Sequence, residues 1–178
     1  MIRKQAEKLL AETKLIERLT VYGKVFITGS YRMNMMCWND IDLYIEDSEE
    51  LRENWFRLVN EVFTTLKPYR FDGAYKADKL FLGCETDITG DCWNIDIWVR
   101  GRAHIENSKV YCDRIVASAE QNPELRDSII AIKKELIDLN MYGLHKMADR
   151  HYHSDEIYRA VLEENIRTAE EFLKKYPK

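Results

Sequence analysis

The feature that most constrains the fold is the stretch Asp-Ile-Asp-Leu-Tyr-Ile-Glu at residues 40–46. Aliphatic residues alternate there with polar ones or tyrosine, which is the pattern of a strand with one buried face. Side chains two residues apart on a strand point to the same side, so Asp40 and Asp42 share the face opposite the aliphatic side chains. The stretch predicts a half-buried strand that holds two carboxylates near the edge of the core.

A second stretch, Cys-Trp-Asn-Ile-Asp-Ile-Trp-Val at residues 92–99, alternates in the same way and carries Asp96 on its polar face. If the two strands are neighbours, about 4.7–4.9 Å apart, Asp96 lies beside Asp40 and Asp42. Carboxylates this close raise each other's pKa unless a cation lies between them. Mg²⁺ prefers oxygen ligands, and three carboxylates can hold two divalent ions about 3.5–4 Å apart for phosphoryl transfer.

Purely structural roles are the alternative for these acids. Asp40 would then cap the strand beside Asn39, and Asp42 would pair with a lysine or an arginine. Asp87 and Asp91 lie close to Asp96 in the sequence and compete with it for the place of the third carboxylate. The sequence leaves this choice open.

A short strand, Lys-Val-Phe-Ile-Thr at residues 24–28, precedes the first acid pair and ends at Gly29-Ser30. Serine is a favoured N-cap residue, so we expect this turn to begin a helix. Glycine lets a phosphate approach the backbone, and free amides at a helix start attract anions. A strand, a Gly-Ser turn, a helix and a second strand would bring those amides beside Asp40 and Asp42.

The chain as a whole divides into an α/β front and an all-helical back. Helices are expected at residues 2–19, 48–66, 108–120, 124–140 and 154–175. A strand near residues 79–86 is joined to the strand near 92–99 by the turn Thr89-Gly90-Asp91. We therefore expect an α/β domain at residues 1–105 and a C-terminal helical region at residues 106–178.

Charge, hydropathy and cysteine content exclude several classes of function. The net charge of -4 argues against long nucleic acid as the main ligand, because phosphate binding needs a basic surface. No apolar run approaches the roughly 18–20 residues of a membrane span, and the charged N-terminal stretch lacks a signal-peptide core. The cysteines form no Cys-x-x-Cys pair, as is usual for reduced thiols in the cytoplasm. We expect a cytoplasmic protein with no membrane partner.

The order of these motifs resembles the signature of the nucleotidyltransferase superfamily, typified by DNA polymerase beta and kanamycin nucleotidyltransferase. The matching residues are Ile27-Thr28-Gly29-Ser30 followed by Asp40-Ile41-Asp42-Leu43, and the resemblance covers roughly residues 22–100. It implies an α+β fold, in which a nucleotidyltransferase-like mixed β-sheet is flanked by helices and followed by a C-terminal helical region. The sequence departs from the commonest pattern at Tyr31-Arg32, where such proteins usually have small residues.

The resemblance also implies the roles of individual residues in the 1–105 domain, which would be the catalytic one. The catalytic and metal-binding residues would be Asp40, Asp42 and Asp96, with two Mg²⁺ (or Mn²⁺) ions as cofactors. Asp96 would also be the candidate general base. The nucleotide-binding residues would be Gly29, Ser30, Arg32 and Lys79, with Lys76 as a further candidate for neutralising the leaving pyrophosphate.

The implied activity is transfer of a nucleoside monophosphate, AMP from ATP, to a hydroxyl of a small acceptor such as an aminoglycoside- or lincosamide-like compound. One alternative is a minimal nucleotidyltransferase that acts as an antitoxin and modifies a helical toxin partner. Another is a catalytically silent nucleotide-binding module, against which the intact set of acids argues. The expected partners are a nucleoside triphosphate and the acceptor; a helical partner protein and a homodimer are compatible with the sequence.

Three other features have a plain structural interpretation beside a functional one. His145 and Asp149 are spaced for one helix face, but a polar helix end is favoured over a metal site, which needs three or four fixed ligands. Met33, Met35, Met36 and Trp38 either pack in the core, the favoured interpretation, or line a base or acceptor pocket. Trp98 shares a strand face with Asp96 and is a candidate for stacking on a ligand ring.

Overall fold

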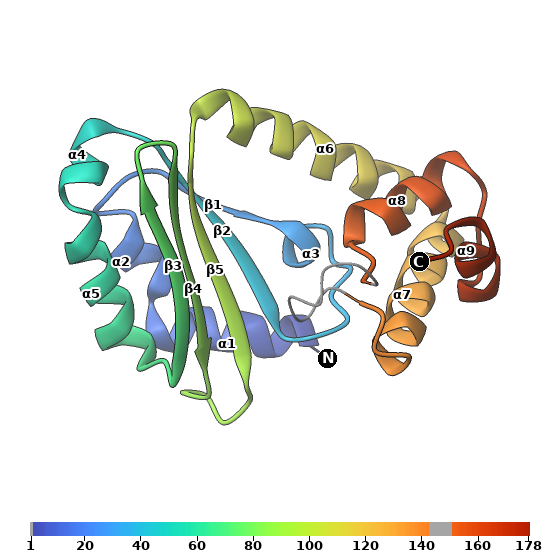
Figure 1. The fold of residues 1–178 in the computed structure, drawn as a ribbon, viewed down its shortest axis with the longest axis horizontal. Helices are drawn as coiled ribbons and strands as arrows, with labels where there is room; N and C mark the ends of the chain where they lie inside the picture. Colours follow the sequence, from blue (N-terminus) through green and yellow to red (C-terminus); the bar gives the residue numbers. More distant parts are fainter. Residues whose placement is uncertain (1, 143–150) are drawn as a thin grey trace. The chain divides into compact units, whose positions relative to one another are not determined.

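The computed structural model describes residues 2–142 and 151–178 (Figure 1). The chain divides into two compact units, residues 1–112 and residues 113–178. The first unit contains the sheet together with the helices that cover it, and the second is helical. The acids and the Gly-Ser turn singled out above all belong to the first unit.

Among the described residues, five strands form one mixed sheet. They are β1 (Val25–Thr28), β2 (Asp40–Glu46), β3 (Arg70–Lys76), β4 (Lys79–Thr86) and β5 (Trp93–Arg100). Their order is β1-β2-β5-β4-β3, in which β2 and β5 are parallel and all other neighbours are antiparallel. The expected fold class, α+β with a mixed sheet, is confirmed.

Alternation along β2 and β5 separates the core from the polar face, as the sequence predicts. The aliphatic residues of both strands are buried, whereas the residues between them are half-buried. The apolar face packs against α1 (Ile2–Thr13), α2 (Leu15–Leu19), α4 (Glu49–Glu53) and α5 (Trp55–Leu66). Because each buried aliphatic side chain contributes about 1.5–3 kcal/mol, a one-residue slip that exposed a whole strand face is strongly disfavoured.

Two of the expected helices are each split by a single residue. Lys14, with a left-handed φ of 52°, separates α1 from α2 within the expected 2–19 helix. Asn54 separates α4 from α5 within the expected 48–66 helix, which Ser48 caps by accepting a hydrogen bond from the Leu51 amide at 3.1 Å. The apolar periodicity continues through both breaks, so it cannot reveal them.

Strand β3 was not expected from the sequence. It forms the edge of the sheet, and its residues are exposed on both faces apart from the half-buried Ala74. A strand without a buried face has no need for apolar alternation, which is the signal that identified β2 and β5. The missed strand therefore has a simple physical cause.

The expected helix after the Gly-Ser turn exists, but its N-cap was wrongly assigned to Ser30. Helix α3 (Gly29–Arg32) starts one residue earlier, so Thr28 occupies the N-cap position and Ser30 lies inside the helix. Gly29 has a φ of +64°, a conformation that is costly for residues with a side chain. The backbone turns at the glycine and not at the serine.

The remaining helices are α6 (Arg102–Gln121), α7 (Pro123–Asp138), α8 (Ser154–Glu163) and α9 (Ala169–Lys175). Helix α6 begins before the expected 108–120 helix and continues from the first unit into the second. The single helix expected at 154–175 is two, because Asn165 has a left-handed φ of 58° and Thr168 starts α9 with a capping box. Among the described helices, none combines the length and hydropathy needed to cross a membrane.

Within the helical unit, α7 packs against α8 and α9 around a buried lysine. Lys133 of α7 is fully buried, and its Nζ donates a hydrogen bond to the Tyr158 hydroxyl at 2.9 Å. Burial raises the pKa of the neighbouring Tyr142 to about 12. Lys133 thus contacts two tyrosines, Tyr142 and Tyr158, an arrangement that the apolar periodicity of α7 does not predict.

Candidate functional site

The two acid-bearing strands are neighbours, and their register brings the acids together. In the parallel pair of β2 and β5, Asp42 is the partner of Asp96, and Asp40 is the partner of Asn94. The Asn94 Nδ2 group donates to Asp40 Oδ1 at 2.8 Å and lies 3.3 Å from Asp96 Oδ1. Asp40, Asp42 and Asp96 therefore lie at one place on the polar face of the sheet, where the Asn94 amide bridges Asp40 and Asp96.

The proximity of these acids is visible in their electrostatics. Burial, and then the charge of Asp42, raise the pKa of Asp96 to about 6. The hydrogen bond from Asn94 opposes this rise only in part, and Asp72 adds to it. A carboxylate whose ionisation is opposed in this way is stabilised by a cation placed beside it.

The Gly-Ser turn lies directly against one of the acids. Thr28 of β1 is the antiparallel partner of Asp42, so Gly29 follows immediately beside that carboxylate. A Cβ atom added at Gly29 would lie 2.2 Å from Asp42 Oδ2, far inside van der Waals contact. The position requires glycine twice, for its left-handed φ and for the space that the Asp42 carboxylate occupies.

We expect Gly29→Ala to lower the free energy of unfolding by about 2–5 kcal/mol, because left-handed strain adds to overpacking against Asp42. Gly90→Ala is the matched control, since Gly90 also has a positive φ (+91°) but no atom within 4 Å of the added Cβ. The control should lose only about 1–2 kcal/mol. Denaturant unfolding of both variants measures the difference, and equal losses would contradict the close contact.

Ser30 and Arg32, which were also predicted to bind nucleotide, both lie in the short helix α3. Ser30 is half-buried in α3, and its carbonyl accepts a hydrogen bond from the Met35 amide at 2.8 Å. The Arg32 guanidinium lies over the Phe26 ring at 4.7 Å, and Phe26 is the β1 partner of Tyr44 in β2. Arg32 therefore lies over the ring of a residue whose strand partner, Tyr44, is two positions from Asp42.

Lys79 lies beside the aromatic pair of Phe81 and Trp98, which belongs to the same cross-strand row as Phe26 and Tyr44. Its Nζ is 5.3 Å from the Trp98 ring, which packs against Phe81 at 4.1 Å between centroids. The Arg100 guanidinium lies over the same Trp98 ring at 4.3 Å. Because Trp98 already contacts three neighbouring side chains, the interpretation of its ring as an open stacking surface for a ligand loses support.

Two residues near the acids were missed by sequence reasoning. Gly83 of β4 is the partner of Asp96, and a Cβ there would lie 3.0 Å from Asp96 Oδ1. Asp72 of β3 is in turn the partner of Gly83. A glycine in the predicted 79–86 strand signals a close approach of some kind, but no signal for Asp72 existed without β3.

The competing acids do not share this place. Asp87 and Asp91 lie in the connection between β4 and β5, and both are exposed. Asp91 accepts a hydrogen bond from Gln5 Nε2 at 3.0 Å. Of the candidates for a third carboxylate, Asp96 is the one opposite Asp42.

Helix α6 contributes further side chains to the polar face next to the turn. The Thr28 and Ser108 hydroxyls are 2.9 Å apart, and the Tyr44 ring meets the His104 ring edge-on at 5.3 Å between centroids. Burial and the charge of Asp42 raise the pKa of Tyr44. The expected 108–120 helix began too late to place His104 on this face.

The donor set fits a hard divalent cation, although it is not a preformed metal site. Within the described residues, no group of three or more His, Cys, Asp or Glu side chains is already arranged around a metal position. The donors that Asp40, Asp42 and Asp96 offer are carboxylate oxygens, which Mg²⁺ prefers. The Asn94 amide, donating to two of these acids, lies where a cation would satisfy the same oxygens.

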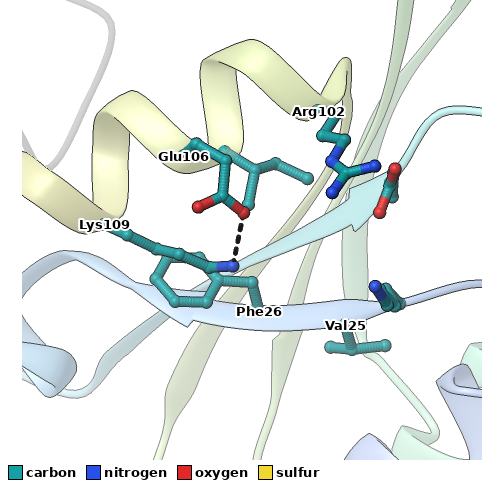
Figure 2. Close-up of a pocket in the computed structure, with 8 residues that line it drawn as sticks. Val25, Phe26, Arg102, Glu106 and Lys109 are labelled. Carbon is teal, nitrogen blue, oxygen red and sulfur yellow. Dashed lines mark hydrogen bonds and ion pairs between the residues drawn. The ribbon is translucent and has the colours of Figure 1, made fainter.

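A separate small pocket lies along β1, between that strand and the first turns of α6 (Figure 2). Cationic and anionic side chains line it together, and Lys109 Nζ donates to Glu106 Oε1 at 2.8 Å. Lys109, Arg102 and Lys24 lower the pKa of the Glu106 carboxyl. The pocket is lined by none of the three acids, and its charges largely compensate one another.

Two further interpretations concern the methionine-rich segment and the pair of His145 and Asp149. Met33 and Met35 are buried, as core packing predicts, whereas Met36 and Trp38 are half-buried. His145 and Asp149 lie outside the described residues.

Comparison of the sequence with protein-family models and with curated proteins gives no match. Comparison with solved structures does find similar folds. The Cid1 poly(U) polymerase with bound MgGTP superposes with a TM-score of 0.67 and 13% identity, covering 90% of this chain and 49% of that one. The polymerase core of TRAMP, an RNA surveillance complex, gives a TM-score of 0.62 and 16% identity, covering 89% and 48%. The fold is that of a nucleotidyltransferase.

The same nucleotidyltransferase fold is shared by terminal uridylyl transferase 4 from Trypanosoma brucei with bound UPU. Its TM-score is 0.59 at 12% identity, and the match covers 85% of this chain and 52% of that one. The chain thus spans about half the length of the solved structures that it matches. The resemblance read from the Gly-Ser and Asp-x-Asp motifs is confirmed at the level of the fold.

Proposed function

We propose that this chain is a metal-dependent nucleotidyltransferase that transfers a nucleoside monophosphate, AMP from ATP, to a hydroxyl group of an acceptor. The observation that carries the proposal is the register of β2 and β5, which pairs Asp42 with Asp96 while Gly29 lies against Asp42. Two opposed carboxylates beside a glycine turn provide places for a cation and for a phosphate, which nucleotidyl transfer needs together.

In this proposal Asp40, Asp42 and Asp96 hold Mg²⁺ or Mn²⁺, as two ions. When bound, the metal neutralises phosphate charge and lowers the pKa of the acceptor hydroxyl. Gly29 and Ser30 hold the β- and γ-phosphates through backbone amides and the serine hydroxyl. Gly29 has no side chain to keep a phosphate away from the backbone.

The reaction forms a bond from the acceptor oxygen to the α-phosphorus and breaks the bond from that phosphorus to the bridging oxygen of pyrophosphate. Asp96 takes the proton of the acceptor hydroxyl as the general base. Arg32 and Lys79 offset the charge of the departing pyrophosphate. Each is also engaged with an aromatic ring, so we assign their role to charge and not to a fixed contact.

For the acceptor we propose a small hydroxylated compound of the aminoglycoside or lincosamide kind. The net charge of -4 supports a small acceptor over a long polyanion. An RNA end is the second candidate, favoured by the fold shared with a poly(U) polymerase and a terminal uridylyl transferase. A helical partner protein is the third acceptor class.

We expect the purified protein to bind a nucleoside triphosphate only when Mg²⁺ or Mn²⁺ is present, because the acids would otherwise repel the phosphates. Isothermal titration calorimetry with ATP and GTP, with and without a chelator, measures this dependence. Binding that is unchanged by chelation would contradict the metal site, and the absence of binding with metal would contradict the function.

The acceptor is then identified by transfer of label. Nucleoside triphosphates labelled at the α-phosphate are incubated with aminoglycosides, lincosamides, short RNAs and co-purifying proteins, and products are resolved by mass. Label on a small compound supports the proposal as stated. Label on RNA or on a protein would support the proposed nucleotidyltransferase activity but would replace the proposed small acceptor.

A further inference from the structure

Strand β3 is the most open part of the sheet. It lies at the end of the strand order, and within the described part of the chain no strand pairs with its outer edge. Six of its seven residues are exposed, so neither face of the strand is fully covered. An open edge of this length is a template for pairing with another strand.

Exposed aromatic side chains accompany this edge on the α5 side. Phe56 of α5 packs on Tyr75 of β3 at 5.0 Å between ring centroids, and Phe63 packs on Phe71 at 4.7 Å. Phe56, Phe71 and Tyr75 nevertheless remain 66%, 62% and 60% exposed. Exposed apolar side chains that cluster on a surface are a feature of interaction sites.

We propose that β3 pairs with β3 of a second copy of this chain, antiparallel and about a two-fold axis at Ala74. The sheet would then continue through the dimer, with both aromatic clusters on the same side. We assign the partner strand to a second copy of the chain because two copies of β3 can pair with oppositely charged residues facing each other. The possible registers are compared below.

In a two-fold antiparallel pair, the residue on the axis lies opposite its own copy, and residues equally far from it on either side are partners. An axis at Asp72 would place that carboxylate opposite its own copy. An axis at Gly73 would place Arg70 opposite Lys76. Both registers oppose like charges, which destabilises a strand pair.

An axis at Ala74 has the opposite result. Asp72 of each copy then lies opposite Lys76 of the other, so two oppositely charged pairs form. Tyr75 lies opposite Gly73, where the absent side chain leaves room for the ring on the aromatic side. Charges on an edge strand commonly prevent pairing, whereas here they favour the register centred at Ala74 over those centred at Asp72 and Gly73.

The test is a charge exchange measured by sedimentation equilibrium across a wide range of protein concentrations. Asp72→Lys alone and Lys76→Asp alone each place like charges opposite one another twice, and each should weaken the dimer about tenfold or more. The double variant restores both pairs with reversed sign and should dimerise like the wild type. Circular dichroism confirms that each variant is folded.

Lys4→Asp is the matched control, because Lys4 is an exposed lysine of α1 far from β3 in the sequence and makes the same change in net charge as Lys76→Asp. It should leave dimerisation unchanged, and an equal effect would attribute the result to net charge and overturn the proposal. A wild-type protein that is monomeric at every concentration would overturn the proposal, even if that monomer binds another protein through the β3 edge. A dimer unaffected by the single changes, or not restored by the double one, overturns it as well.

Discussion

Asp42→Asn is expected to reduce the rate of nucleotidyl transfer about a thousandfold or more while leaving the fold intact. Asp42 is the acid in contact with both halves of the proposed site, since it is the partner of Asp96 and its Oδ2 lies against Gly29. Asparagine keeps the shape of the side chain but removes the charge that would hold the metal. The measurement is the rate of label transfer, with unfolding curves to establish that stability is retained.

Asp87→Asn is the control for this change. It removes the same charge from an exposed acid in the connection between β4 and β5, and it should transfer at the wild-type rate. A fully active Asp42→Asn protein would rule out the proposed mechanism. Loss of transfer in both Asp42→Asn and Asp87→Asn would indicate that the third carboxylate is Asp87 in the loop and not Asp96.

Asp96→Asn should inactivate the protein and, at the same time, make its metal-free form more stable at neutral pH. The pKa of Asp96 rises from 3.8 in the unfolded chain to about 6 in the fold. Between these values the native state binds more protons than the unfolded state, so the free energy of unfolding falls as the pH rises through this window and stays low above it. Removing the carboxylate removes that loss, which we expect to be worth about 1–3 kcal/mol.

Denaturant unfolding in the presence of a chelator, at pH about 4 and about 8, measures this effect. The wild type should lose stability between the two pH values relative to Asp96→Asn, and Mg²⁺ should restore stability to the wild type alone. A variant that is less stable than the wild type at the higher pH would contradict the raised pKa of Asp96, which burial and the charge of Asp42 cause. An active Asp96→Asn protein would contradict its role as base and ligand.

Several parts of the fold could not be read from the sequence, for identifiable reasons. Strand β3 carries no buried face, so it lacks the alternation by which strands are recognised. Lys14 and Asn54 interrupt helices whose apolar periodicity runs on unchanged, because the break lies in the backbone angles of one residue. The bridging role of Asn94 depends on a partner 54 residues away in the sequence.

The sequence by itself determined which residues form β2 and β5, and that their acids lie on the half-buried face. This follows from local chemistry, because alternation of apolar and polar side chains assigns the two faces of a strand wherever the strand is placed. Only the tertiary structure decided that β2 and β5 are parallel neighbours, in the register that pairs Asp42 with Asp96 and Asp40 with Asn94. Strand pairing is a contact between distant segments, so it depends on how the whole core packs and not on the periodicity of either strand.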